Sequence, residues 1–292
     1  MKRTIFTGIL VLATGAGLLM AQKGKDKNDK SKDKNQPQQQ QQSAQSGPKT
    51  SPGEAQALQA LIQAQGKPDE TIVAAENLLT KYADTSFKDT ALFMEAMAYQ
   101  QKGDRDKQQI YAERVLAANP KYFQASLMLA ELTVQQTREH DLDRDEKLAK
   151  ADKYANEAIA NIGAAAKPNP QLTDQQWEEA KKDLMAQAHD ALGMSALQRK
   201  NYDGAIKELK EAVEGGAHPE PAFEVRLASA YQQSGKNDEA IALAEKIMNE
   251  AQTPQQIKSV AQSIRAAAVV AKNGGKPLNA PAPPPQVEIK KQ

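Results

Sequence analysis

Two stretches of this chain repeat each other at a fixed interval, and that interval constrains the fold more than any other feature. Leu192 and Leu227 stand 35 positions apart, and Ala205 and Ala240 are separated by the same number. Because two pairs of residues agree, the interval indicates a structural period and not a chance effect of an Ala-rich composition. A period of roughly 20 to 50 residues is typical of stacked helical units.

Each of the two copies reads as a pair of helices joined by a short break. The second helix of each copy carries apolar residues that share one face: Ala205, Leu209 and Ala212 in the first copy, and Ala240, Ala244 and Ile247 in the second. The breaks fall at Lys200-Asn201 and at Gly235 to Asn237. A pair of this kind cannot bury its own apolar face, so it must stack on neighbouring pairs.

At these residues the chain resembles the tetratricopeptide repeat family, which has Leu-Gly and a following Tyr in the first helix and small Ala residues in the second. The matching residues are Ala96, Tyr99, Gly103, Asn119-Pro120, Leu129-Ala130, Ala151, Ala155, Ala158, Leu192, Gly193, Ala205, Ala212, Leu227, Tyr231 and Ala240. The early Trp of the family is missing, and its place is taken by Leu92, Ser126, His189 and Glu224. The resemblance covers residues 53–273 and implies an all-α fold, a right-handed superhelical stack of antiparallel helix pairs. Composition predicts disordered N- and C-terminal tails beside it.

Composition agrees with an all-α fold and excludes several functional classes. Aromatic residues are only 4% of the chain, so the core must be built from Ala, Leu, Ile and Met. The chain has no cysteine, which excludes disulfides, thiol catalysis and lipidation of an N-terminal Cys. With a net charge of +1 and no basic stripe interleaved with aromatics, nucleic acid is not an expected partner.

The two ends of the chain differ in composition from its middle. Residues 1–21 read as a secretory signal, with Lys2 and Arg3 before an apolar run and Ala21 as a plausible cleavage position. A linker rich in Lys, Asp and Gln follows at 22–52, and a Pro-rich tail occupies 274–292. We therefore expect an exported protein, periplasmic or secreted. Alternatively, an uncleaved signal would anchor it in the inner membrane.

Helix boundaries can be placed between residues 53 and 273. The pattern predicts a first pair broken at 66–68, helices at 88–102 and 104–118, and a first helix at 122–136. An insertion at 137–146 precedes a helix at 147–162. Thr173 and Gln176 form the signature of a capping box at the start of a long helix, and a final helix beginning near Pro254 is expected to cover the end of the stack.

No set of residues forms a recognisable catalytic or cofactor site. His140, His189 and His218 fall in different repeats without metal-ligand spacing. An acidic run at Asp141, Asp143, Asp145 and Asp152 is spaced like a calcium loop, but Glu146 stands where the loop needs Gly. The alternative is a solvated acidic lead-in to the next helix. We expect no enzyme activity, no cofactor and no metal.

The family resemblance implies that the first helices line a concave surface. The candidate residues for binding a peptide there are Phe93, Met97, Leu127, Glu131, Asp190, Met194, Leu197, Val225 and Ser229. Met97, Glu131, Met194 and Ser229 stand where a carboxylate-binding subset of the family has Asn, so an apolar or amphipathic segment fits better. Alternatively, several of these residues contact only neighbouring repeats.

The sequence thus predicts a non-enzymatic protein–protein interaction scaffold or adaptor of the bacterial cell envelope. Its partners would be other proteins, as yet unidentified, of the envelope or outside the cell. A membrane would be a partner only if the signal segment stays uncleaved. The alternative is a small-molecule or lipid carrier that uses the Met-rich trough.

Overall fold

The computed structural model describes residues 50–275, which form eleven helices and no strand. In chain order the helices are α1 (Pro52–Gln63), α2 (Pro68–Lys81), α3 (Lys88–Lys102), α4 (Arg105–Ala118), α5 (Phe123–Gln136), α6 (Arg144–Ala164), α7 (Asp174–Gln198), α8 (Tyr202–Gly215), α9 (Pro221–Gln233), α10 (Asn237–Asn249) and α11 (Gln255–Lys272). The predicted secretory signal lies outside the described residues, as do nearly all of the linker and the Pro-rich tail. Among residues 50–275 no helix combines the length and apolar character needed to cross a membrane.

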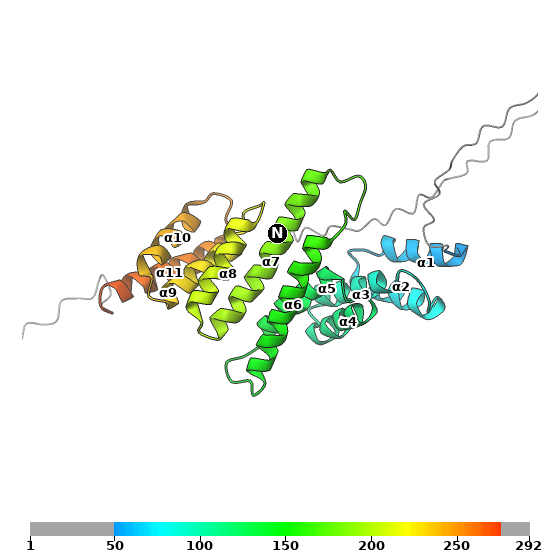
Figure 1. Ribbon diagram of the computed structural model, residues 1–292, viewed down its shortest axis with the longest axis horizontal. Helices are drawn as coiled ribbons and strands as arrows, with labels where there is room; N and C mark the ends of the chain where they lie inside the picture. Colours follow the sequence, from blue (N-terminus) through cyan, green and yellow to red (C-terminus); the bar gives the residue numbers. More distant parts are fainter. Residues whose placement is uncertain (1–49, 276–292) are drawn as a thin grey trace, which may run out of the picture.

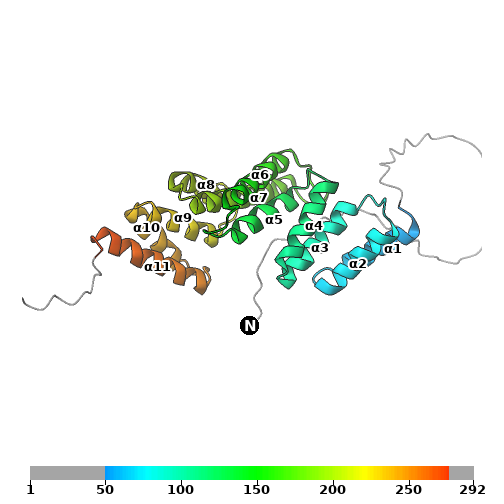
Figure 2. The ribbon, with the colours of Figure 1, turned by 90° about the horizontal axis from the view of Figure 1, so that it is seen from below.

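Consecutive helices form five antiparallel pairs, from α1 with α2 to α9 with α10, and α11 packs on the last pair. The pairs follow one another in chain order along the molecule (Figure 1). Seen from below, the stack is an arch with α6 and α8 on its outer side and α5, α9 and α11 on its inner side (Figure 2). The predicted all-α stack of helix pairs is confirmed.

Small residues let the helices within a pair approach closely. In α7 a Cβ atom added at Gly193 would lie only 2.5 Å from Cγ of Leu209 in α8, so no larger residue fits without displacing that buried Leu. The corresponding residues of the other first helices, Ala96, Ala130 and Ala228, are fully buried. A core of this kind depends on Ala and Gly at the crossing points and not on large side chains.

Helices α6 and α7, which belong to neighbouring pairs, are longer than the helices beside them and project beyond the stack (Figure 1). The predicted capping box is present at the start of α7: Oγ1 of Thr173 accepts from the Gln176 amide at 3.1 Å, and Oε1 of Gln176 accepts from the Thr173 amide at 2.9 Å. The predicted start of α6 at Lys147 was wrong, because the helix begins three residues earlier at Arg144. Asp145 and Glu146 lie in its first turn, where their negative charges interact favourably with the positive end of the helix dipole.

The last helix covers the end of the stack as predicted. Ala261 of α11 is fully buried, and Ile257 and Ile264 pack on the same cluster, which includes Val225 of α9 and Ile247 of α10. The opposite side of α11 carries exposed polar residues: Gln256, Ser259, Gln262 and Ser263. A terminal helix with one apolar and one polar face is what a stacked array needs to end in water.

Candidate functional site

The nine residues predicted for the inner surface differ in how much of each side chain a partner could reach. Three are buried: Leu127, Asp190 and Val225. Five are half-buried: Phe93, Met97, Met194, Leu197 and Ser229. Glu131 is exposed. The candidate surface is therefore discontinuous.

The three buried residues hold successive repeats together. Leu127 packs with Ala158 and Ile162 of α6 in the core between the third and fourth pairs. Val225 belongs to the cluster that joins α9, α10 and α11. The Asp190 carboxylate of α7 is bonded to the Arg226 guanidinium of α9. Since these side chains are already engaged, they contribute to stacking, as the alternative interpretation of the sequence suggested for some of them.

Two methionines predicted for the inner surface, Met97 and Met194, are half-buried on first helices. Met97 of α3 is half-buried and lines a hollow of about 140 Å³, whose wall consists of Gln65, Gly66, Thr71, Met94, Met97, Ala98 and Gln101. Met194 of α7 is half-buried as well, and neither residue belongs to the hydrophobic clusters found within residues 50–275. Flexible thioethers of this kind adapt to apolar groups of different shape.

Asp190 is an acid held in a low-dielectric setting. Burial raises its pKa to about 6, while the Arg226 charge acts in the opposite direction. Its second oxygen, Oδ1, has no hydrogen-bond partner among the described residues. The Arg226 guanidinium also lies over the Phe223 ring, 5.9 Å from the ring centre. This arrangement links α7 to α9.

The acidic run after α5 is neutralised by side chains of the protein itself. The Lys147 ammonium lies 2.9 Å from both Asp141 and Asp143, and Asp152 is paired with Arg199 at 2.9 Å. Lys147 lowers the pKa of Asp141, as an adjacent ammonium must. Within residues 50–275 no three potential metal ligands converge, and a lysine lies between the first two carboxylates of the run that is spaced like a calcium loop.

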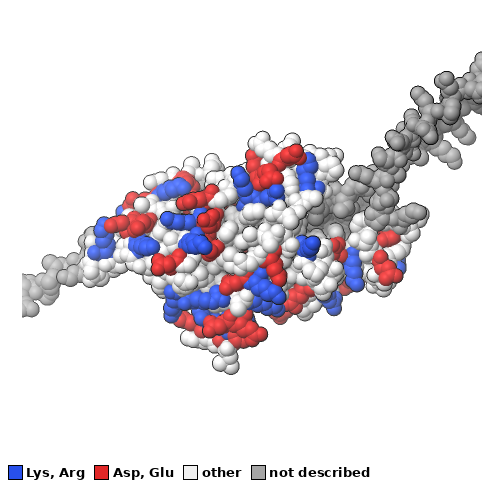
Figure 3. Space-filling model, viewed as in Figure 1, with Lys and Arg blue, Asp and Glu red and all other residues white. Residues whose placement is uncertain are grey.

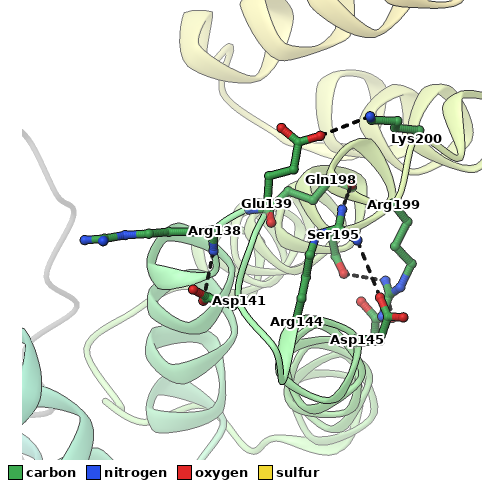
Figure 4. Close-up of polar contacts among 10 residues, drawn as sticks. Arg138, Glu139, Asp141, Arg144, Asp145, Ser195, Gln198, Arg199 and Lys200 are labelled. Atoms are coloured by element: carbon green, nitrogen blue, oxygen red, sulfur yellow. Dashed lines mark hydrogen bonds and ion pairs between the residues drawn. The ribbon is translucent and has the colours of Figure 1, made fainter.

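The same insertion is bonded to the end of α7 and to the turn that follows it (Figure 4). The Arg144 guanidinium donates to the Gln198 carbonyl, and the Gln198 side chain donates to the Val134 carbonyl at 2.7 Å. Lys200, in the turn after α7, pairs with Glu139 at 3.1 Å (Figure 4). These contacts link the turn after α5 to the turn after α7, so the insertion has a structural role in joining the third and fourth helix pairs.

The three histidines do not meet, in agreement with their sequence spacing. His189 of α7 is hydrogen-bonded to Glu208 of α8 at 2.8 Å and is partly buried. His218 is bonded to Asp183 at 2.7 Å, and this carboxylate raises its pKa. His140 is exposed in the insertion. His189 and His218 therefore each take part in a local contact between neighbouring parts of the fold.

Sequence reasoning missed one unusual acid, Glu95 of α3. It is fully buried at the place where the other first helices have Leu129, Leu192 and Leu227. Neither of its carboxyl oxygens has a hydrogen-bond partner among the described residues. Burial raises its pKa to about 7, and the adjacent Tyr111 hydroxyl acts in the opposite direction. Aligning the repeats by their Leu position would have revealed it.

Charges on the surface are mixed in sign. On the face shown in Figure 3, Lys and Arg alternate with Asp and Glu over all the repeats, and no region of one sign stands out. A face of this kind creates no strong field for attracting a polyanion.

Two segments of the chain match models of the tetratricopeptide repeat, residues 89–122 and residues 196–264. The first contains nearly all of α3 and α4, and the second runs from the end of α7 into α11. No curated protein matches the chain.

Several solved structures are similar to it. One is TTC0263, a thermophilic TPR protein in Thermus thermophilus, at 21% identity and a TM-score of 0.49, covering 72% of this chain and 98% of that one. A second is MamA MSR-1 C2, at 17% identity and a TM-score of 0.44, covering 73% of this chain and 96% of that one. A third is the assembly chaperone of RpL4, Acl4, at 12% identity and a TM-score of 0.40, covering 76% of this chain and 98% of that one. Similarity at this level carries no information about function. The two matching segments show that this chain contains tetratricopeptide repeats, which in general serve as protein–protein interaction scaffolds.

Proposed function

We propose that this protein is a non-enzymatic adaptor of the bacterial cell envelope that binds an apolar or amphipathic segment of a partner protein on the inner side of its arch. The observation that carries the proposal is the pair of half-buried methionines, Met97 and Met194, on first helices of separate repeats. Two apolar contacts on different repeats suit a partner segment that runs along the stack.

The route to the envelope rests on the N-terminal sequence alone. Lys2 and Arg3, the apolar run after them and Ala21 have the order of a secretory signal. Cleavage would leave Gln22 as the first residue. N-terminal sequencing of the protein purified from an envelope fraction tests this directly. An intact Met1 in the membrane fraction would contradict cleavage and support an anchored form.

Site-specific photo-crosslinking in cells tests the binding surface. A photoreactive residue replaces Met97 or Met194 in the test variants, and Val73 or Ile110 in the controls. The control residues are apolar and 65% and 48% exposed, but they lie on second helices, α2 and α4. We expect the same partner to crosslink at both methionines and at neither control.

Charge substitution gives the matching loss of function. Met97→Glu together with Met194→Glu should abolish capture of that partner, whereas Val73→Glu with Ile110→Glu should leave it unchanged. Circular dichroism establishes that both double variants keep their helices. Equal crosslinking at all four positions would contradict an inner binding surface. A small molecule retained in native mass spectrometry, with no protein crosslink, would favour the carrier.

A further inference from the structure

Asn273 and Gly274, at the end of α11, form the only Asn-Gly pair in the 292-residue chain. The side-chain carbonyl carbon of Asn lies one methylene beyond Cα, so the amide nitrogen of the next residue can reach it and close a five-membered ring. Gly has no Cβ and offers the least steric resistance to that approach. This pair is therefore the place in the chain where such a cyclisation is least hindered.

The pair forms part of the turn that ends α11. Gly274 and Gly275 have φ values of 67° and 80°. Their amides donate to the carbonyls of Ala271 at 3.2 Å and of Val270 at 2.9 Å, respectively. These two bonds, with glycine just past the helix, make a Schellman motif. Because the Gly274 amide proton is bonded while the turn is closed, the cyclisation must start from the open turn.

Burial does little to keep this turn closed. Every residue from Ala271 to Gly275 is exposed, and the last buried residue of α11 is Ala268. Lys272 forms an ion pair with Asp238, but both side chains are more than half exposed, and such pairs stabilise little. Helix ends with few buried contacts open at little cost in free energy. The open turn is therefore readily reached.

The Asp-Gly pair at 203–204 could form the same ring, but its setting differs. Asp203 lies in the first turn of α8, and the Gly204 amide donates to Oδ1 of Asn201 at 3.1 Å. The helix that continues from this turn is fixed by four buried residues: Ala205, Ile206, Leu209 and Ala212. Opening this turn would disturb the core of a repeat, so we expect Asp203 to stay unchanged.

We propose that Asn273 is a site of spontaneous modification, at which the side-chain amide is converted to a carboxylate with water as the co-reactant. The Gly274 nitrogen loses its proton and bonds to Cγ of Asn273, while the Cγ–Nδ2 bond breaks and ammonia leaves. Water then opens the resulting succinimide at one of its two carbonyl carbons. One opening gives aspartate, and the other gives isoaspartate, whose backbone contains an additional methylene.

Either product weakens the end of the capping helix. A carboxylate at residue 273 lies at the C-terminal end of α11, where the helix dipole makes a negative charge unfavourable. In isoaspartate the additional methylene also displaces Gly274 and Gly275 from the carbonyls to which they are bonded. The buried residues Ala261 and Ala268 lie further inside the helix, so α11 remains on the stack while its last turn opens.

Mass spectrometry of the full chain tests the proposal. The protein is kept at 37 °C between pH 6 and pH 8 and then cleaved after glutamate, which releases residues 251–288 as one fragment. We expect residue 273 to gain about 1 Da and to give two separable products. The rate should rise with pH, because the attacking nitrogen must lose its proton. Asn273→Gln should abolish the conversion over the same period, because its longer side chain must close a larger ring.

Asn249 provides the matched control. It is exposed at the end of α10, but Glu250 follows it instead of Gly. Asn249 should keep its amide, and Asn249→Gln should leave the conversion at residue 273 unchanged. A capped peptide of residues 269–277 gives the rate of the fully open turn.

The proposal is overturned if residue 273 keeps its amide while the peptide is fully converted. It is equally overturned if Asn249 or Asp203 changes as fast as Asn273. In the converted chain, the amide NMR signals of Gly274 and Gly275 should move to their positions in the peptide, whereas those of Ala261 and Ala268 should stay. Unmoved glycine signals would contradict the opening of the turn. None of these results bears on crosslinking at Met97 and Met194.

Discussion

The second and fifth helix pairs each bury one glutamate, but in opposite places of the same repeat. We call the place of the family's early Trp in a first helix the early position, and the place three residues after it the late position. In α3 the early position holds Leu92 and the late one holds Glu95. In α9 the early position holds Glu224 and the late one holds Leu227. Lys246 of α10, whose side chain is 56% exposed, forms an ion pair with Glu224. The residues that influence the pKa of Glu95 are Glu76 of α2 and Tyr111 and Arg114 of α4.

The difference shows what each position of the repeat permits. An acid at the early position lies near the edge of the stack, where Lys246 bonds to Glu224. An acid at the late position lies in the core between pairs, where burial favours the neutral form. One repeat architecture therefore yields a surface-linked ion pair at one end of the molecule and a protonatable core carboxyl at the other.

The largest predicted effect follows from the raised pKa of Glu95. Its value of about 7 exceeds the ordinary 4.5, so the folded chain keeps a proton that the unfolded chain loses. The free energy of unfolding should therefore fall as pH rises from about 4.5 to about 7, by roughly 3 kcal/mol in all. Glu95→Leu removes this dependence and should stabilise the protein by about that amount at pH 8 and less at pH 5.

Urea unfolding at both pH values measures this difference. Glu211→Gln, at an exposed position of α8 that does not act on Glu95, is the control and should change the free energy of unfolding by less than about 0.5 kcal/mol. A Glu95→Leu variant that gains no stability at pH 8 would mean that the carboxyl has a partner, such as an internal water.

Lys246→Met tests the ion pair between Glu224 and Lys246 in the fifth helix pair. It leaves the Glu224 carboxylate buried without the donor that Lys246 supplies, and we expect a loss of about 2 kcal/mol at pH 7. The loss is smaller than for a fully buried pair because Lys246 is 56% exposed, so water can partly replace it.

The double variant Lys246→Met with Glu224→Leu separates the ion pair from simple packing. It should recover most of the lost stability, since the early position accommodates Leu92 in α3. Thermal unfolding of the single and double variants provides the measurement. No recovery would show that Glu224 has a function in the fold beyond its bond to Lys246.

The sequence alone revealed most of the fold because its period and its breaks are local features. Gly103 marks the end of α3, which falls at Lys102 as predicted, and its φ of 72° is a conformation that favours Gly. The start of α6 was misplaced because the acidic stretch before Lys147 reads equally well as a loop or as the first turn of a helix.

The candidate surface was less predictable, because burial depends on the angle between successive pairs. Leu127 and Met97 lie on the same predicted face of their helices, yet only Leu127 is covered by the next pair. The bond from Lys246 of α10 to Glu224 of α9 spans 22 positions. No short motif encodes such a contact.

The smallest predicted effect concerns Ser126, which takes the early position in α5. Its side chain is fully buried, and its Oγ has no hydrogen-bond partner among the described residues. Ser126→Ala removes the unpaired hydroxyl with little change in volume, so the free energy of unfolding should rise by about 1 kcal/mol.

Thr137→Val is the matched control, because the Thr137 hydroxyl is also buried but donates to the Thr133 carbonyl at 2.7 Å. Removing a satisfied hydroxyl should lower the free energy of unfolding by about 1 kcal/mol. The two variants must therefore shift the urea midpoint in opposite directions. If Ser126→Ala destabilises the protein as Thr137→Val does, the early position holds a bonded polar group in α5 as it does in α9. Only α3, with its apolar Leu92, would then differ.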